Sequence, residues 1–477
     1  MTPTVHSIIR PTPTKADSVS YNPALVFEAG QRNHHIANTA YPIEHKKTVG
    51  PYRVNKEEYL SLSTERFANL DTLSLYTHIP FCETRCYFCE YTVVDKKEID
   101  ETKRYFDALN QEAEMYSQLL SRRKLTGFDI GGGTPSFPEA KYIASHLAVI
   151  KRNFDLQSEC EISIETTPRI ASLEVDKINA YKEMGIDRIS MGVQVTEPDL
   201  LKVLGRERNG IEHHYSAVRH IRDAGFQKFN LDLMYGFAGQ SNESWLATLK
   251  HAIDLDPEFI TLYRMRYKLT RISHQANDVN LNQINQQSKI AVKALTDAGY
   301  WANPGKNTFS KVSNSTGTSA YLTERVICGQ PYLGLGLGAQ SFTSSTLSYN
   351  SGAAGKILRP YIKSIEADQL PIQDLYVLPY RHSMAKMIAV SFYFGEVNLQ
   401  AFQNRFGVSL EEVFQPEVDF VLSNGYMQYT ESKNGQELNI DHHSLSLTEK
   451  GAANFNGVIA LFFAPSVQEY LLNKYGV

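Results

Sequence analysis

The chain has 477 residues, an apolar content of 42% and a formal net charge of −4, which allow two or three domains with a substantial core. This nearly balanced charge gives no reason to expect a nucleic-acid-binding protein. Five cysteines in so long a chain do not make a disulfide framework. We identify neither a secretory signal nor an apolar run of the roughly 20 residues that a membrane span needs, so we expect a cytoplasmic protein.

Residues 1–70 are polar, rich in Pro, His and Asn, and weakly periodic. We interpret them as an N-terminal extension that wraps a domain or stays partly loose. Residues 71–350 alternate short apolar runs with segments of helical periodicity. Six of these runs predict strands: "TLSLYTHI", "LTGFDIGGG", "CEISIETTP", "DRISMGVQ", "FNLDLMYG" and "FITLYRM". Six strand-then-helix units predict an α/β fold with parallel strands, either a doubly wound sheet or a barrel.

Residues 351–477 have a mostly helical pattern that ends in a predicted strand pair around "YMQYTE" and "LSLTEKGAANF". A small helical domain with a hairpin resembles a winged helix, a shape often used to bind DNA. No basic face is evident here, so we favour a lid or packing role for this C-terminal domain.

Three cysteines, Cys82, Cys86 and Cys89, follow the first predicted strand at intervals of four and three residues. A structural zinc site would need a fourth Cys or His, and the next cysteine lies about seventy residues further on. His78 could be that ligand, although its place on the preceding strand favours a role in orienting the loop. Iron–sulfur clusters are also held by thiolates. A four-iron cluster with three protein ligands would leave one iron free for a substrate or cofactor.

The C-x3-C-x2-C spacing after "YTHIPF" resembles the signature of the radical S-adenosylmethionine (SAM) superfamily. This resemblance implies a 4Fe-4S cluster whose open iron is chelated by the amino and carboxylate groups of SAM. One electron from the cluster then cleaves SAM to a 5′-deoxyadenosyl radical. The resemblance also implies an incomplete (β/α)6 barrel, a flavodoxin or ferredoxin as electron donor, and function without oxygen.

Polar or glycine residues recur at the ends of the later predicted strands, as in the segment "DIGGGTPS". Because ligands bind at the carboxyl ends of parallel strands, this recurrence indicates one common site. The resemblance assigns one set of residues to the cluster-bound SAM: Tyr76, Gly132, Thr134, Glu165 and Arg206. A second set would face a second SAM molecule: Phe88, Gly133, Gln194, Asp232 and Met234.

Several stretches, among them "GGGTPS", "LDLMYGFAGQ" and "YLGLGLGAQSF", narrow the resemblance to the branch around the oxygen-independent coproporphyrinogen III oxidase. This branch also contains class C radical SAM methyltransferases and a heme chaperone. Two features differ from the oxidase. Tyr91 stands where the oxidase has a further cysteine, and residues 307–330 replace the oxidase's own segment.

These departures led us to favour methyl transfer to an sp2 ring carbon, using two SAM molecules, over oxidative decarboxylation. Our first hypothesis for the substrate is menaquinone, methylated at C8, which would require transient contact with a membrane. The alternatives are coproporphyrinogen decarboxylation, another tetrapyrrole reaction, or a heme chaperone. A chaperone would be expected to carry heme-binding His, and the His pairs at 34–35 and 213–214 are weak support for it.

Overall fold

The computed structural model describes residues 14–33, 41–94, 96–268, 270–343, 345–431, 440 and 443–477. An eleven-stranded sheet forms its centre, in the order β11-β10-β9-β8-β1-β2-β3-β4-β5-β6-β7. Strands β1 to β6 are all parallel and correspond to the six predicted runs. Their bounds are Thr72–Ile79, Lys124–Gly132, Asp155–Thr166, Arg188–Gln194, Lys228–Tyr235 and Phe259–Arg264. The predicted α/β fold with a partial barrel of parallel strands is confirmed.

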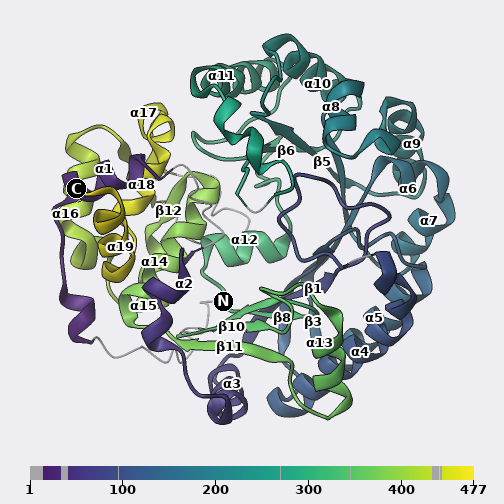
Figure 1. The fold of residues 1–477 in the computed structure, drawn as a ribbon, viewed down its shortest axis with the longest axis horizontal. Helices are drawn as coiled ribbons and strands as arrows, with labels where there is room; N and C mark the ends of the chain where they lie inside the picture. The colour runs from purple at the N-terminus through teal and green to yellow at the C-terminus, as the bar shows by residue number, and fades with distance from the viewer. Residues whose placement is uncertain are drawn as a thin grey trace.

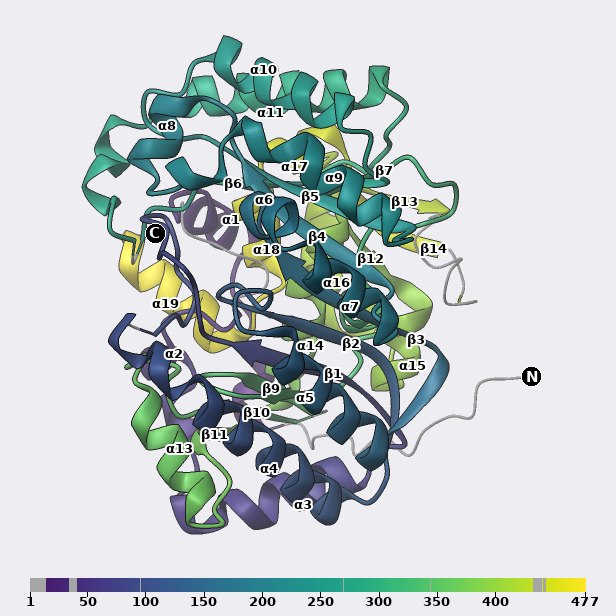
Figure 2. The same cartoon turned by 90° about the vertical axis from the view of Figure 1, so that its right-hand side faces the viewer.

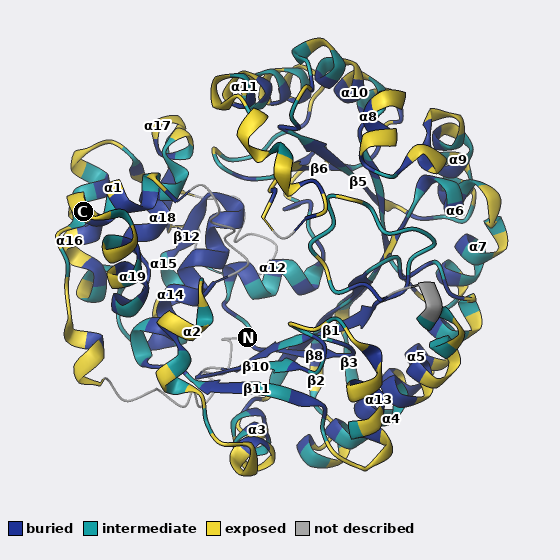
Figure 3. Cartoon of the chain, viewed as in Figure 1, coloured by how far each residue is buried: buried dark blue, intermediate teal, exposed yellow. Residues whose placement is uncertain are grey.

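Helices connect successive parallel strands and cover the outside of the curved sheet (Figures 1 and 2). Buried residues run along the strands and the inner sides of the helices, whereas exposed residues line the outer helix surfaces (Figure 3). A buried apolar stripe on each helix is what holds it against the sheet. These helices are α4 (Thr102–Leu120), α5 (Ala140–Asn153), α6 (Pro168–Leu173), α7 (Val175–Glu183), α8 (Pro198–Val203), α9 (His214–Asp223), α10 (Asn242–Asp254) and α11 (Leu281–Asp297).

Further strands widen the sheet on both sides of the parallel core. Strand β7 pairs antiparallel with β6, and β8 pairs parallel with β1. Strands β9, β10 and β11 then continue antiparallel, so the sheet includes a strand beyond residue 350. The bounds of these strands are Thr308–Ser310, Tyr332–Leu335, Gln340–Phe342, Thr346–Asn350 and Ile372–Val377. The domain boundaries at residues 70 and 350 stay predictions.

Helix α12 (Ala320–Ile327) points toward the centre of the barrel and packs on β1, β2 and β3 (Figure 1). Glycine in β2 permits this approach, because a Cβ on Gly127 would lie 2.3 Å from the Tyr321 nitrogen. The helix starts at Ser319, whose side chain accepts a hydrogen bond from the backbone of Leu322. Helix α12, which belongs to the segment predicted to differ from the oxidase, therefore lies against the parallel strands.

The C-terminal region is mainly helical, as predicted, with a small sheet of order β12-β14-β13. Its strands are Glu396–Asn398, Met427–Glu431 and His443–Leu447, so the predicted strand pair is present as β13 and β14. Its helices, after α13 (Leu358–Glu366) on the barrel, are α14 (Tyr380–Ser391), α15 (Leu399–Phe406), α16 (Leu410–Ser423), α17 (Glu449–Ala453), α18 (Phe455–Leu461) and α19 (Pro465–Tyr475). None of the described helices is long and apolar enough to cross a membrane.

The described part of the N-terminal extension packs on both halves of the molecule. Helix α1 (Pro23–Gln31) lies against α18 and α19, and a Cβ on Gly30 would lie 2.5 Å from the Ala460 Cβ. Helix α3 (Tyr59–Ala68) packs on α4, while α2 (His45–Thr48) contacts α19. These contacts agree with an extension that wraps a domain.

Candidate active site

The three cysteines lie on the loop that follows β1, at the carboxyl end of the parallel strands. The thiols of Cys82 and Cys86 each accept a hydrogen bond from a distant segment. Thr134 Oγ1 donates to Cys82 Sγ at 3.4 Å, and Arg206 Nη1 donates to Cys86 Sγ at 3.3 Å. The cysteine loop is thus held by Thr134, which follows the three glycines 131–133, and by Arg206 on the loop after β4. Donors aimed at sulfur are what stabilise a metal-bound thiolate.

Desolvation raises the pKa of the Cys82 thiol to about 12, while Thr134 and Arg206 act in the opposite direction. Since thiolates are the ligands, binding of iron must displace this proton. No three His, Cys, Asp or Glu side chains in the described ranges converge as ligands of a single metal ion. A four-iron cluster does not need such convergence, because each cysteine binds a different iron.

His78 orients the cysteine loop through both of its ring nitrogens. Its Nε2 donates to the Thr92 carbonyl at 2.7 Å, and its Nδ1 lies 3.2 Å from the Tyr76 hydroxyl. Burial lowers the pKa of His78 to about 4, which keeps the ring neutral. The positioning role that we favoured for His78 fits these contacts.

The glycine segment, residues 131–133 at the end of β2, lies directly against the cysteine loop. The Gly133 nitrogen donates to the Ile79 carbonyl at 2.8 Å, and the Thr134 nitrogen donates to the Phe81 carbonyl at 2.8 Å. A Cβ on Gly133 would lie 2.8 Å from the Phe81 oxygen and 2.9 Å from Cys82 Sγ. Gly132 has a φ of 125°, a conformation that favours glycine. No residue with a side chain could make this close approach.

Three carboxylates line the inner face of the barrel: Asp129 on β2, Glu165 on β3 and Asp232 on β5. Glu165 Oε2 accepts a hydrogen bond from the Gly132 nitrogen at 3.3 Å, which links it to the glycine segment. Desolvation raises the pKa of Glu165, and the charges of Asp232 and Asp129 add to this effect. Water screens part of this repulsion, because the Glu165 side chain remains exposed inside the barrel.

Gln194 and Arg206 lie together beyond the end of β4. Gln194 has a φ of 69° where the pairing of β4 with β5 shifts register, so its backbone is strained. Arg206 is 7% exposed and donates through Nη2 to the Gly192 carbonyl. Gln194 Oε1 and Arg206 Nε are buried without a hydrogen-bond partner among the described residues. Buried polar atoms of this kind call for a polar ligand.

The remaining predicted residues fall into two places. Tyr76 lies beside Gly131 and Glu165, since a Cβ on Gly131 would touch both side chains. Phe88 and Met234 belong to one apolar cluster next to Asp232, in which the rings of Phe88 and Phe237 are 6.4 Å apart. All thirteen predicted site residues therefore lie on the cysteine loop, at the carboxyl ends of β1 to β5, or on the loop after β4.

A belt of inward-facing polar side chains, most of which we did not predict, crosses the inner face of the barrel. Ser163 donates to Asp129 at 2.6 Å, and Ser190 donates to Asp232 at 3.0 Å. The belt continues through Asn230, Thr261 and Thr308 to Tyr393 of the C-terminal region, with contacts of 2.9, 3.1 and 3.5 Å. A carboxylate inside the apolar run "FDIGGG" was the available signal for Asp129, whereas no local pattern indicates Tyr393.

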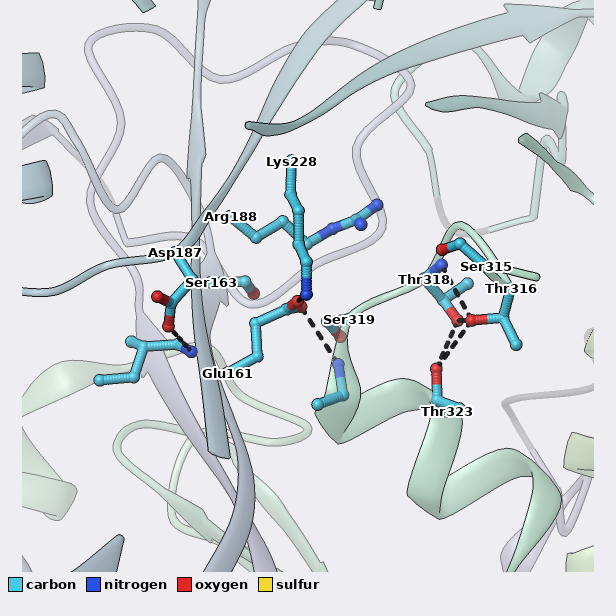
Figure 4. Close-up of polar contacts among 12 residues, drawn as sticks. Glu161, Ser163, Asp187, Arg188, Lys228, Ser315, Thr316, Thr318, Ser319 and Thr323 are labelled. Atoms are coloured by element: carbon cyan, nitrogen blue, oxygen red, sulfur yellow. Dashed lines mark hydrogen bonds and ion pairs between the residues drawn. The ribbon is translucent and has the colours of Figure 1, made fainter. Parts of the chain in front are cut away.

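Polar contacts anchor the segment before α12 near the amino ends of β4 and β5 (Figure 4). Ser319 donates to Asp129 Oδ2 at 2.7 Å, and Glu161 accepts from the Ala320 nitrogen at 3.2 Å and from Lys228. Arg188 donates to the Gly317 carbonyl at 2.6 Å. Asp129 therefore joins the polar belt to the start of α12.

The profile of the Radical SAM superfamily matches residues 76–252, which contain the cysteine loop, the glycine segment and Arg206. This segment of the chain is similar to the Radical SAM superfamily. Proteins of this superfamily use a 4Fe-4S cluster and SAM, the cofactors that we predict for this chain. The residues present fit both groups. Three cysteines lie on one loop, the thiols of Cys82 and Cys86 each accept a hydrogen bond, and Gly133 lies against Cys82. Gln194 and Arg206 each have a buried polar atom without a partner among the described residues.

The curated relatives fall in the predicted branch of the superfamily. Over 233 residues the chain is 33% identical to the oxygen-independent coproporphyrinogen III oxidase of Salmonella typhimurium, covering 48% of this chain and 50% of the relative. Over 200 residues it is 37% identical to the heme chaperone HemW of Haemophilus influenzae, covering 41% and 51%. The aligned part of the chain thus spans about half the length of these relatives.

The fold is similar to that of the solved coproporphyrinogen III oxidase HemN from Escherichia coli. The TM-score is 0.72 over 89% of this chain and 96% of that chain, at 22% sequence identity. At this identity the similarity concerns the fold alone, including the partial barrel and the helical C-terminal region.

Proposed function

We propose that this chain is a radical SAM enzyme whose substrate is a tetrapyrrole. The two curated relatives carry different activities in their names, an oxidase and a chaperone, but coproporphyrinogen and heme are both tetrapyrroles. The tetrapyrrole is what the two have in common. Methyl transfer to menaquinone, our first hypothesis from the sequence, gains no support from these relatives, so the tetrapyrrole alternative takes its place.

The observation that carries the proposal is the meeting of the cofactor residues and the polar belt at one end of the barrel. Thr134 and Arg206 contact the cysteine loop, while Glu165 reaches the glycine segment from inside the barrel. When bound, the cluster and SAM supply a 5′-deoxyadenosyl radical. The part played by the chain is to hold SAM beside Glu165 and Arg206 and to hold a substrate against the interior lined by Asp129 and Asp232.

A second SAM molecule remains part of the proposal as a prediction. Phe88 and Met234 share one apolar cluster, and Gln194 has a buried Oε1 without a partner among the described residues, which would suit it. An electron donor of the flavodoxin or ferredoxin type is proposed as the partner, because the cluster needs a low-potential electron.

The segment that forms β7 and α12 bears on which tetrapyrrole reaction is catalysed. It departs from the oxidase pattern in sequence, its helix α12 packs on β1, β2 and β3, and Ser319 before that helix contacts Asp129. A changed interior favours a tetrapyrrole reaction other than the oxidase's decarboxylation. Heme binding without turnover is the second candidate, supported by the 37% identity to a heme chaperone.

The test uses anaerobically reconstituted protein with dithionite and SAM carrying a deuterated methyl group. Coproporphyrinogen III, heme and menaquinone are supplied separately, and all products are analysed by mass spectrometry. We expect 5′-deoxyadenosine together with a modified tetrapyrrole. Methylated menaquinone with S-adenosylhomocysteine would refute the tetrapyrrole proposal, and heme binding without any modified product would favour the chaperone.

A further inference from the structure

Two tyrosine rings remain accessible beside the carboxylates of the barrel interior. Tyr91, two residues after Cys89, is 63% exposed, and Tyr263 near the end of β6 is 37% exposed. Large aromatic rings are usually packed against other groups, because covering them contributes much of a core's or an interface's stability. Neither ring has been assigned a role in binding the cluster or SAM.

Tyr263 faces the interior of the barrel, and Tyr91 lies on the cysteine loop at the carboxyl end of the strands. Tyr263 alternates along β6 with Thr261, whose hydroxyl donates to Asn230 of the polar belt at 2.9 Å, so the two side chains share one face of the strand. Desolvation raises the pKa of Tyr91, and the charges of Glu165 and Asp232 raise it further, so this phenol lies near both carboxylates. Desolvation also raises the pKa of Tyr263, with Asp232 among the further causes. Both phenols therefore lie near Asp232.

The C-terminal region braces one of these rings. Tyr393 lies in the short 3-10 helix η9 (Phe392–Phe394), which follows α14, and is 6% exposed. Its hydroxyl is hydrogen-bonded to Tyr263 and lies 3.5 Å from Thr308 Oγ1 at the end of the polar belt. This places a side chain from outside the parallel strands at the edge of the site.

Asp232 lies near both phenols and has unused capacity to accept hydrogen bonds. Its Oδ2 accepts from Ser190 at 3.0 Å and its Oδ1 from Asn230 at 2.9 Å, one bond to each oxygen. A carboxylate can accept about four. With Glu165 and Asp129 nearby, the interior favours N–H donors over further carboxylates.

We infer that Tyr91 and Tyr263, the latter braced by Tyr393, are the aromatic walls that position a pyrrole macrocycle, and that Asp232 accepts a hydrogen bond from ring N–H groups tilted out of the macrocycle plane. This inference rests on the proposed function and deepens it, because it names the residues that would select a pyrrole macrocycle. The C-terminal region then contributes to substrate binding through the brace on Tyr263. Carboxylate side chains of the macrocycle point away from the acidic interior.

The experiment measures the dissociation constant of coproporphyrin III by fluorescence quenching on the anaerobic, cluster-loaded full chain. Tyr91→Leu and Tyr263→Leu each remove a ring, Tyr393→Phe removes only the brace, and Tyr215→Leu is the control. Tyr215 is 57% exposed on α9, where its hydroxyl donates to Asp254 at 2.7 Å. Iron content and circular dichroism verify that every variant is folded and loaded.

We expect the dissociation constant to rise about tenfold for each ring removed and roughly threefold for Tyr393→Phe, with Tyr215→Leu unchanged. The zinc complex of coproporphyrin III, which has no ring N–H, should bind the unmodified chain more weakly than the free base. Wild-type affinity in both ring variants would overturn the inference while leaving the proposed function intact. Failure of the unmodified chain to bind either porphyrin would overturn both.

Discussion

Replacing Arg206 tests the geometry of the cofactor site most directly. Its guanidinium is 7% exposed, donates to Cys86 Sγ at 3.3 Å and to the Gly192 carbonyl, and keeps a buried Nε without a described partner. Our prediction places the SAM carboxylate next to this group. Hydrogen bonds to charged groups contribute about 1.5–3 kcal/mol, so Arg206→Gln should weaken SAM binding about 10- to 150-fold. Arg206→Lys keeps the charge but loses the planar fork and should fall in between.

The assay is equilibrium dialysis of SAM against anaerobic protein whose iron and sulfide contents have been measured. Arg208→Gln is the matched control, because Arg208 is two residues away, 60% exposed and paired with Glu83 at 3.0 Å. An exposed pair of this kind contributes about 0–1 kcal/mol, so this variant should bind SAM almost normally. An unchanged affinity in Arg206→Gln with a full cluster would refute the assignment, as would an equal loss in the control.

Three further predictions concern the cluster, the glycine segment and a buried carboxylate. Cys82→Ala should abolish cluster assembly and SAM cleavage, measured by visible absorption and 5′-deoxyadenosine; retained cleavage would contradict the radical chemistry. Gly133→Ala should lower iron content and SAM affinity, because its Cβ would lie 2.8 Å from the Phe81 oxygen, whereas a Cβ on Gly50 would meet nothing closer than 3.7 Å and Gly50→Ala should be tolerated. Glu112 is fully buried, and burial raises its pKa from 4.5 to about 7, so the native state holds this proton more tightly than the unfolded chain. The free energy of unfolding should therefore fall by about 3 kcal/mol as the pH rises from about 4.5 to 7, and urea unfolding should show that Glu112→Gln removes this slope.

Much of the cofactor site could be predicted because its residues carry local signals. The cysteine spacing, the glycine triplet before Thr134 and the carboxylate of Glu165 each stand at the end of a short apolar run. Parallel strands bring such ends to one edge of the sheet, so their order along the chain was enough to group them. The six parallel strands themselves followed from the alternation of apolar runs with helical segments.

Other parts of the site depend on which segments meet in space. The bond from Arg206 to Cys86 joins residues 120 positions apart, and Tyr393 reaches Thr308 from a region predicted only as a helical domain. Neither residue has a local pattern that specifies its partner. The menaquinone preference gains no support from the comparisons, since it rested on overall resemblance and on no particular residue.

The amino-acid sequence by itself determined the resemblance to the radical SAM superfamily, the parallel strands and the loop that carries Cys82, because these depend on residue spacing and on periodicities of two and 3.6 residues. Only the tertiary structure decided that α12 packs on the parallel strands, that Asp129 anchors it, and that Tyr263 and Tyr393 meet beside Asp232. Sheet register and helix packing set those contacts, and they are properties of segments far apart in the chain.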